Sequence, residues 1–440
     1  MKKFIKITVA IILSLLLFLV LGLQYRQYLA NRIYIPKRAT AVIKISVDEI
    51  YKTIGLNIIT SVGYYSKKDT AKTAKKTDIG LTLPANIYFF NTGARQDVYF
   101  SKFKVTNFKL LENFLYKILG LTKDSTQNLA RSKSNKIVVF YTKTSAVISF
   151  SINRNISNQA LADIIAEKDF APLSDSNFKQ LVKASDDIVY QDNESFATLN
   201  FNNGNVAFKA TTVLPALVPN TAYHNAINYD SSTITAWLDA DVKQIKNRTF
   251  KLGQLSMQTD SLLKYYGGGF NLNWLGTTTQ IDSVITYGYN DDFEKIEELT
   301  LQKKKIPNLT ANIKANAKGL KNYLANQGFL NLDSNKVNRQ AFPLYKIFLA
   351  NDSDNLYLAT SSSAKAKQMG VNTSGFCMLY VNFQKLVAQS AIPSLNQRLS
   401  LYQTLMITGR QQKNRQVLFS GQLKLKDKKH NSLVKILKNF

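Results

Sequence analysis

The sequence predicts an α+β fold: an N-terminal transmembrane helix, then two similar halves of mainly antiparallel sheet with helices packed on one face. Four observations lead to this prediction. The chain opens with an uncharged, mostly apolar run, and alternating strands then recur, each followed by apolar residues at helical spacing. Several of these units occur twice, about 190 residues apart, which indicates an internal duplication. Hairpin patterns outnumber parallel crossovers, so we expect antiparallel sheets with one wet face.

Composition limits the class of protein. The 440 residues are 45% hydrophobic, enough for one large core or two ordinary ones, and the 11% aromatic share excludes a disordered chain. Lys and Arg number 57 against 29 Asp and Glu. The net charge of +28 fits either the composition of an AT-rich genome together with general solubility, which we favour, or an anionic surface as a partner. Most of these cations are Lys, which argues against nucleic acid, because base readout relies on Arg. The single cysteine, Cys377, excludes a disulfide-stapled module.

The N-terminus predicts a membrane anchor. Three lysines at positions 2, 3 and 6 precede an apolar run from Ile7 to Leu23, about 25 Å of helix. Leu21-Gly22-Leu23-Gln24 is a poor small-residue cleavage site, so an uncleaved signal anchor over residues 1–30 is favoured over a cleaved signal peptide. This places the protein in the cytoplasmic (inner) membrane as a single-pass protein. Everything after residue 30 would then lie outside the cytoplasm, in the periplasm of a Gram-negative cell.

A strand followed by Asp or Asn and then a helix recurs along the rest of the chain. The pattern first appears in "AVIKISVDEIYKTIG", where Asp48 lies at the junction. It returns in "STITAWLDADVKQIKN" with Asp241 and in "GFCMLYVNFQKLVAQ" with Asn382. Asp and Asn suit a helix N-terminus because their side chains accept a hydrogen bond from a free amide of the first turn.

Two longer segments carry the apparent duplication. Residues 97–115 can be laid over residues 282–300 at an offset of 185, which predicts a second helix starting at "DDFEKIEELT" with Asp292 as its N-cap. The basic run "QKKKIP" would close this helix. A hairpin pattern over 136–151 likewise corresponds to one over 345–361.

These correspondences predict a first α+β half at 31–212, a connecting segment at 213–232 and a second half at 233–440. The basic stretches 66–76 and 122–136 are expected to be surface loops. The glycines of "YYGGGFNLNW" predict a turn or bulge leading into a strand. A short amphipathic helix, capped by Asn431 or Ser432 and docked on the sheet, is expected at the C-terminus.

The stretch "IPKRATAVIKISVDEI" resembles the start of uncharacterised bacterial envelope families that are membrane-anchored or lipidated. The resemblance implies a duplicated α+β exterior region over most of residues 35–440. It implies no activity and no functional residues.

No catalytic, cofactor-binding or metal-ligating residue is predicted. His224 and His430 are the only histidines and are expected to be surface residues, since no nucleophile motif accompanies them. The S-x-x-K matches, among them Ser176 to Lys179 and Ser362 to Lys365, fit chance in so Ser- and Lys-rich a chain. No zinc, Walker or dinucleotide motif is present, and no cofactor is predicted.

The sequence therefore favours a non-enzymatic, membrane-anchored envelope protein that acts through binding or structural support outside the cytoplasmic membrane. Its partner would be another envelope protein or an anionic surface. Two alternatives stay open: an envelope hydrolase whose site is assembled from distant residues, and a binder of anionic lipid or polymer.

Overall fold

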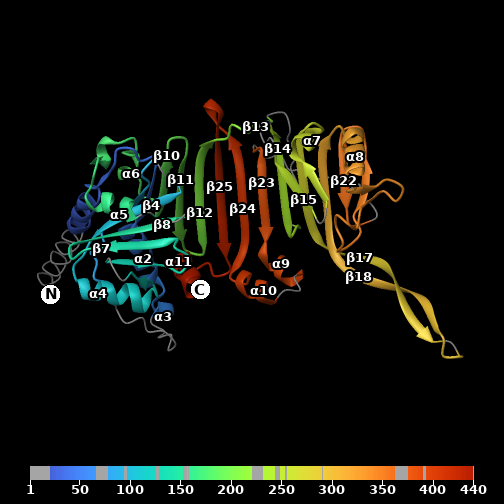
Figure 1. The fold of residues 1–440 in the computed structure, drawn as a ribbon, viewed down its shortest axis with the longest axis horizontal. Coiled ribbons are helices and arrows are strands. Elements are labelled where there is room, and N and C mark those ends of the chain that lie inside the picture. The colour runs from blue at the N-terminus through green and yellow to red at the C-terminus, as the bar shows by residue number, and fades with distance from the viewer. Residues whose placement is uncertain are drawn as a thin grey trace, which may run out of the picture. The chain divides into compact units, whose positions relative to one another are not determined.

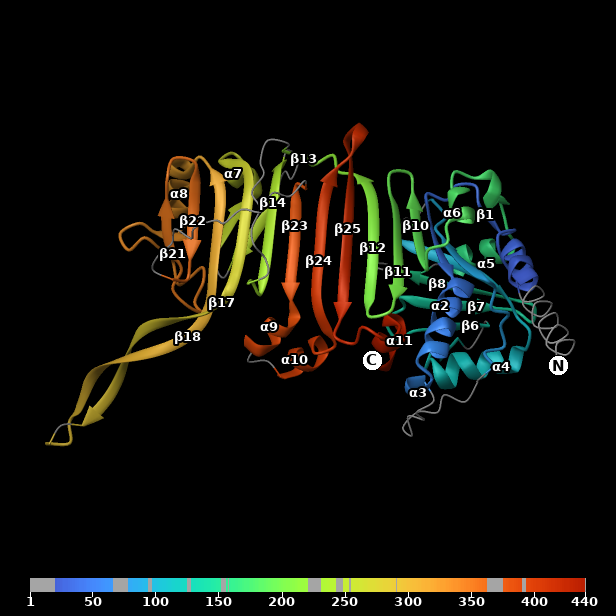
Figure 2. The ribbon, with the colours of Figure 1, turned by 180° about the vertical axis from the view of Figure 1, so that it is seen from behind.

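The computed structural model describes residues 20–65, 78–93, 97–124, 128–151, 156, 158–220, 231–242, 248–252, 255–289, 291–361, 375–389 and 393–439 (Figures 1 and 2). The chain divides into two compact units. Unit 1 comprises Met1–Ala210 and Lys429–Phe440, and unit 2 comprises Thr211–Lys428.

Unit 1 is built mainly from short antiparallel strands. Its strands are β1 Tyr34–Pro36, β2 Ala41–Ser46, β3 Asn86–Phe90, β4 Val98–Lys104, β5 Thr122–Lys123, β6 Leu129–Arg131, β7 Ile137–Tyr141, β8 Ser145–Ser151, β9 Phe170–Pro172, β10 Ile188–Asp192 and β11 Phe196–Asn202, and β12 Asn205–Val213 leads into unit 2. Its helices are α2 Val47–Thr60, α3 Val62–Tyr65, α4 Phe108–Asn113, the π-helical turn Phe114–Ile118, α5 Asn158–Ile165, the 3-10 turn Leu173–Asp175, α6 Gln180–Lys183 and α11 Ser432–Lys438. The main strands pair in the order β11–β10–β2–β3–β4–β8–β7–β6–β5.

Helices cover both faces of the unit 1 sheet. Val138 and Val147 point into one cluster with α5 and α6, whereas their neighbours Val139 and Ala146 point into a second cluster with α4. Successive side chains of a strand point to opposite faces, so both faces of β7 and β8 are buried. The expected arrangement, with helices on one face and water on the other, is therefore wrong for unit 1.

Unit 2 is also dominated by strands. Its strands are β13 Leu217–Pro219, β14 Ile234–Val242, β15 Thr249–Leu252, β16 Leu255–Gln258, β17 Tyr266–Tyr289, β18 Lys295–Ala315, β19 Leu330–Asn331, β20 Lys336–Val337, β21 Phe348–Asn351, β22 Asn355–Ala359, β23 Cys377–Asn382, β24 Tyr402–Gln411 and β25 Gln416–Leu425. Its helices are α7 Thr259–Leu263, α8 Ala317–Asn326, α9 Phe383–Gln389 and α10 Pro393–Leu399, with a 3-10 turn at Lys413–Arg415. The main strands pair in the order β25–β24–β23–β14–β17–β18–β22–β21–β20–β19.

The predicted α+β class with two similar halves is wrong. Antiparallel strands dominate, and the 185-residue offset matches unlike elements. The segment expected to be the second helix lies in a turn and in β18, and the lysines expected to close it, residues 303–305, lie in the same strand. The helix that follows β18 is α8, whose N-cap Asn316 corresponds to Asn107 at an offset of 316 − 107 = 209. The two units do share an order of strand pairing. The series β11–β10–β2–β3–β4–β8–β7–β6–β5 of unit 1 corresponds strand by strand to β24–β23–β14–β17–β18–β22–β21–β20–β19 of unit 2.

Several local predictions are confirmed. The side chain of Asn382 accepts a hydrogen bond from the Lys385 amide at 3.1 Å. Asn431 caps α11 through the Leu433 and Val434 amides, at 3.0 and 3.4 Å. The hairpins β7–β8 and β21–β22 form as expected. A register shift between Tyr266 and Gly269 gives the predicted bulge, at which Gly268 has a φ of +83°.

Other local predictions fail or lie outside the described residues. Asp48 lies in the first turn of α2 rather than at its cap, and pairs with Arg26 at 3.1 Å. The predicted loop 122–136 contains β5 and β6, and Leu129 is fully buried. The helix expected after Asp241 and the loop 66–76 fall outside the described residues.

The predicted transmembrane anchor, and with it the predicted single-pass location in the inner membrane and periplasm, is contradicted. Within the described part of the chain, no helix has the length and apolar character that crossing a bilayer requires. Residues 1–19, on which most of the expected span falls, lie outside the described residues.

Candidate functional site

The most distinctive feature of unit 2 is the outer part of the β17–β18 hairpin. Nearer the sheet, β17 pairs with β14 up to Trp274, and β18 pairs with β22 from Thr310 onward. From the pair Thr277–Pro307 outward, β17 and β18 pair only with each other among the described strands. Both ribbon views show this part running beyond the sheet (Figures 1 and 2). We call residues 275–308 the arm.

The arm is not needed to connect its two strands. In the pairing order of unit 1, β3 and β4 occupy the places of β17 and β18, and the seven residues 91–97 join them. The arm places 34 residues at the same point of unit 2, because 308 − 275 + 1 = 34. A two-stranded ribbon standing alone in water is only marginally stable. This elaboration therefore needs an explanation other than chain connectivity.

The two faces of the arm differ in chemistry. Residues directly opposite on antiparallel strands project from the same face, and the register pairs Ile281 with Lys303, Ile285 with Leu299, and Ser283 with Leu301. The odd-numbered positions therefore share one face. Five of its apolar members are more than half exposed: Ile281, Ile285, Tyr287, Leu299 and Leu301. We call the whole odd-numbered face the apolar face. On it, Leu299 is 71% and Leu301 is 67% exposed.

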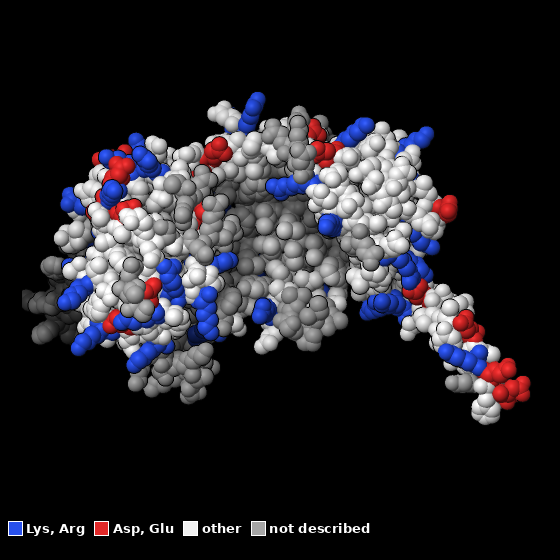
Figure 3. Space-filling view, in the orientation of Figure 1, with Lys and Arg blue, Asp and Glu red and all other residues white. Residues whose placement is uncertain are grey.

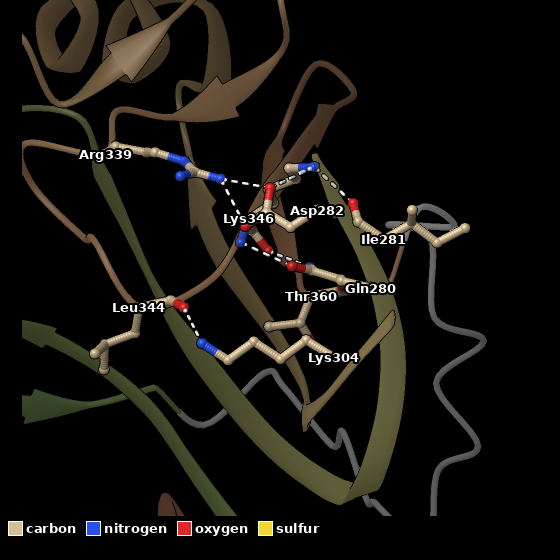
Figure 4. A network of polar contacts seen from close by, with 8 residues as sticks. All are labelled: Gln280, Ile281, Asp282, Lys304, Arg339, Leu344, Lys346 and Thr360. Atoms are coloured by element: carbon tan, nitrogen blue, oxygen red, sulfur yellow. Dashed lines mark hydrogen bonds and ion pairs between the residues drawn. The ribbon is translucent and has the colours of Figure 1, made fainter. Parts of the chain in front are cut away.

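The even-numbered face is tied to unit 2 at the base of the arm (Figure 4). The side-chain amide of Gln280 donates to the carbonyls of Lys346 and Thr360, at 2.6 and 2.7 Å, and its oxygen accepts from the Lys346 amide at 2.9 Å. Asp282 accepts two hydrogen bonds from Arg339, at 2.8 and 3.0 Å, and pairs with the Lys346 ammonium at 3.2 Å. These contacts fix the direction in which the arm leaves the sheet. They use the polar face and leave the apolar face uncovered.

The charges at this base favour the ionised form of Asp282. The hydrogen bond from Lys346, together with the nearby charge of Arg339, lowers the pKa of the Asp282 carboxyl below its usual value. Lys346 also donates to the Ile281 carbonyl at 2.8 Å, so one ammonium bridges a side chain and the backbone of β17.

The arm carries opposite charges at its two ends. Residues 291–298 at the tip contain five acids and one lysine, a net charge of 1 − 5 = −4. Lys303, Lys304 and Lys305 lie near the base. Figure 3 shows acidic side chains toward the end of the arm and basic ones where it joins the sheet. The acid-rich stretch thus ends a protruding ribbon on a chain that is otherwise basic.

The tip contains an exposed aromatic residue in an unfavourable backbone conformation. Phe293 has a φ of 59° and its side chain is 86% exposed. A bulky residue in the left-handed region is strained, and such strain tends to persist at binding sites. The side chain has no core to occupy, so packing within the molecule does not explain it.

The sequence-level candidates for chemistry do not assemble into an active site. His430 stacks on Tyr64 with ring centroids 3.6 Å apart, and Ser176 closes a turn through the Leu173 carbonyl at 2.7 Å. His224 and the Ser362–Lys365 pair lie outside the described residues. Among the residues that are described, no group of three or more His, Cys, Asp or Glu is placed to hold a metal ion.

Two cavities of unit 1 are lined by carboxylates that already have partners. In a cavity of about 340 Å³, Glu167 pairs with Lys102 at 2.8 Å. In one of about 400 Å³, Asp169 pairs with Lys37 at 3.3 Å, and Asp163 accepts from the Gln159 amide. These carboxylates stabilise the local structure, and their contacts do not favour the hydrolase alternative.

Lysines and arginines are scattered over the face drawn in Figure 3 rather than gathered in one patch. This distribution gives no specific support to the alternative of a binder for anionic lipid or polymer.

Sequence reasoning missed the arm as a candidate site, although signals for it were present. "TQIDSVITYGY" is rich in β-branched and aromatic residues over a length unusual for one strand, and "YNDD" is a turn signal directly after it. Reading the following acids as a helix start hid the second strand of the ribbon.

Comparison with protein-family models, curated proteins and solved structures gives no match for this chain. The resemblance to envelope families therefore stays a prediction.

Proposed function

We propose that this protein acts without catalysis, by binding another macromolecule through the arm. The observation that carries the proposal is the apolar face: five large side chains lie uncovered on one side of a ribbon that the sheet does not require. Contiguous exposed apolar surface of this kind marks interaction sites in soluble proteins.

The energetics fit a binding surface. Full burial of a Leu, Ile or similar side chain contributes about 1.5–3 kcal/mol, and these side chains are already partly covered, so each can contribute roughly 1 kcal/mol. Five of them give about 5 kcal/mol, to be set against association costs of about 4–15 kcal/mol. The apolar face alone would then bind weakly, and the charges of the arm and Phe293 would have to add to it.

The arm is also held in place before binding. The contacts of Gln280 and Asp282 fix its base, so a partner does not bear the full entropic cost of ordering the ribbon. Pre-organisation of this kind is expected of a docking element.

Site-specific photo-cross-linking in the native host tests the proposal. A benzophenone amino acid replaces Leu301 on the apolar face in one variant and Gln302 on the opposite face in the other. Both positions are exposed and adjacent, so expression and reactivity should match. We expect protein adducts from position 301 and far fewer from position 302. Equal yields from both faces, or none from either, would contradict the proposal.

A further inference from the structure

We propose that the occupant of the apolar face is the same face of a second copy of this chain, with the two arms stacked antiparallel. This inference rests on the proposed function and names its partner. Two ribbons stacked face to face lie about 10 Å apart, as packed sheets do. A two-fold axis between them would make the contact isologous, which is the commonest symmetry of homodimers.

The pattern of residues along β18 is self-complementary about Thr300. The two-fold axis lies between the two ribbons and runs across the strands at the pair Val284–Thr300. It places Leu299 of one copy opposite Leu301 of the other. On β17 the same axis places Tyr287 opposite Ile281 and Ile285 opposite Ser283. Four of the five apolar side chains thereby meet another apolar side chain, and Ile285 meets a small one.

The charges follow the same symmetry. On the same face of β18, the next residues beyond Leu299 and Leu301 are Glu297 and Lys303, and Glu297 of one copy faces Lys303 of the other. This contact occurs twice because of the two-fold axis. Both side chains belong to the apolar face, and within the described part of the chain neither forms an ion pair. The wider polarity agrees, since antiparallel stacking brings the acidic tip of each arm near the lysines at the base of the other. Electrostatic complementarity of this kind sets orientation and register.

The contact is bounded at its ends. The next positions outward, Lys295 and Lys305, would bring like charges together, and the Lys295 ammonium already lies 3.8 Å from the centroid of its own Tyr287 ring. Stable interfaces bury about 800 Å² on each partner, more than a short ribbon offers. Self-association is therefore expected to be reversible and to depend on concentration. An unrelated apolar partner would not account for the matched Glu297 and Lys303.

Charge reversal in the full chain, followed by sedimentation equilibrium, tests this assignment. The wild type should show a monomer–dimer equilibrium. Glu297→Lys and Lys303→Glu should each weaken dimerisation by about tenfold or more, because each places two like-charge pairs in the contact. An equimolar mixture of the two single variants should dimerise like the wild type, since both pairs are then opposite in sign. The double variant should recover for the same reason.

Glu298→Lys is the matched control, because it makes the same charge change on the opposite face and should leave dimerisation unchanged. A wild type that stays monomeric, or single variants that do not complement one another on mixing, would overturn the inference. If position 301 still cross-links to a different protein in that case, the proposed function stands and only the identity of the partner is wrong. If position 301 gives no adduct, the proposed function fails as well.

Discussion

Asp282 shows how one carboxylate can orient an element of more than thirty residues. Its contacts with Arg339 and Lys346 join the arm to the loop between β20 and β21, at a point where the arm has already left the sheet. Each contact is exposed and modest by itself. Together with the hydrogen bonds of Gln280 they give the arm one direction.

Asp282→Asn is expected to loosen the base of the arm without unfolding unit 2. The substitution removes the charge that binds Arg339 and Lys346 but keeps the size of the side chain. In hydrogen–deuterium exchange, amides of residues 283–301 should exchange faster, while those of β14 stay protected. Glu298→Gln removes a carboxylate from the same face nearer the tip and should leave the pattern unchanged. Unaltered exchange in Asp282→Asn would show that the base is held by other contacts.

Lys44 gives unit 1 a pH dependence of defined sign. The residue is 2% exposed, and its ammonium donates to the carbonyls of Leu181 and Ala184, at 3.0 and 2.6 Å. Burial lowers the pKa of Lys44 from 10.5 to about 8, against the opposing charges of Glu49 and Asp186. Between these two values the unfolded chain binds a proton that the folded chain does not, so stability rises with pH in this window.

We therefore expect the free energy of unfolding by urea to increase from about pH 8 toward pH 10.5, relative to a Lys44→Met variant measured at the same pH values. Below about pH 8 the difference between the two proteins should be constant, because Lys44 is then protonated in both states. A difference that stays constant across the whole range would mean that the folded and unfolded pKa values of Lys44 are the same.

At the residue scale, much of the structure could be predicted from the sequence. The caps at Asn107, Asn382 and Asn431 depend on contacts two or three residues away, so a local pattern contains the information. The environment of Lys44 could not be predicted from a local pattern, since its partners lie some 140 residues along the chain.

At the scale of elements, the stretch from Asp291 to Thr300 shows where local reasoning failed. It has an acidic start, good helix formers, and apolar residues at 293, 296 and 299, which together satisfy a helical pattern. In the structure it is a turn followed by a strand. The register with β17 pairs its residues with the β-branched run at Val284–Thr286, and this pairing outweighs a weak helix propensity.

The prediction of a loop over residues 122–136 was wrong for a related reason. Its basic, polar composition suggested solvent, yet Leu129 and Ala130 are buried and β6 pairs with β7. Two buried residues within a polar stretch are enough to place a short strand in the sheet, and composition averaged over the stretch conceals them.

The arm was missed for the opposite reason, because its apolar residues are exposed and a pattern of apolar residues is normally read as core.

At the scale of the whole molecule, the arm is an addition to unit 2 rather than part of its fold. The clusters around Leu320 and around Trp237 contain no residue of the arm beyond the sheet. The stability of unit 2 should then come from these clusters and from the strand pairs up to Trp274 and Leu309.

Shortening the arm tests this separation. Replacing residues 283–301 with Asn-Gly joins Asp282 to Gln302, which are opposite each other in the register, through a two-residue hairpin turn. The variant keeps the contacts of Gln280 and Asp282. We expect its thermal unfolding midpoint to stay within about 2 °C of the full chain, because little buried surface is removed. A much lower midpoint would show that the arm contributes to the fold.

The central claim is that the odd-numbered side of this ribbon is a binding face, and a cross-linking scan tests it most directly. The benzophenone amino acid is placed at each position from 298 to 303 in turn, and adduct yield is measured in the native host. The account predicts high yields at 299, 301 and 303 and low yields at 298, 300 and 302, the two-residue period of a strand with one covered face. A period of three to four residues, or uniformly low yields, would contradict it.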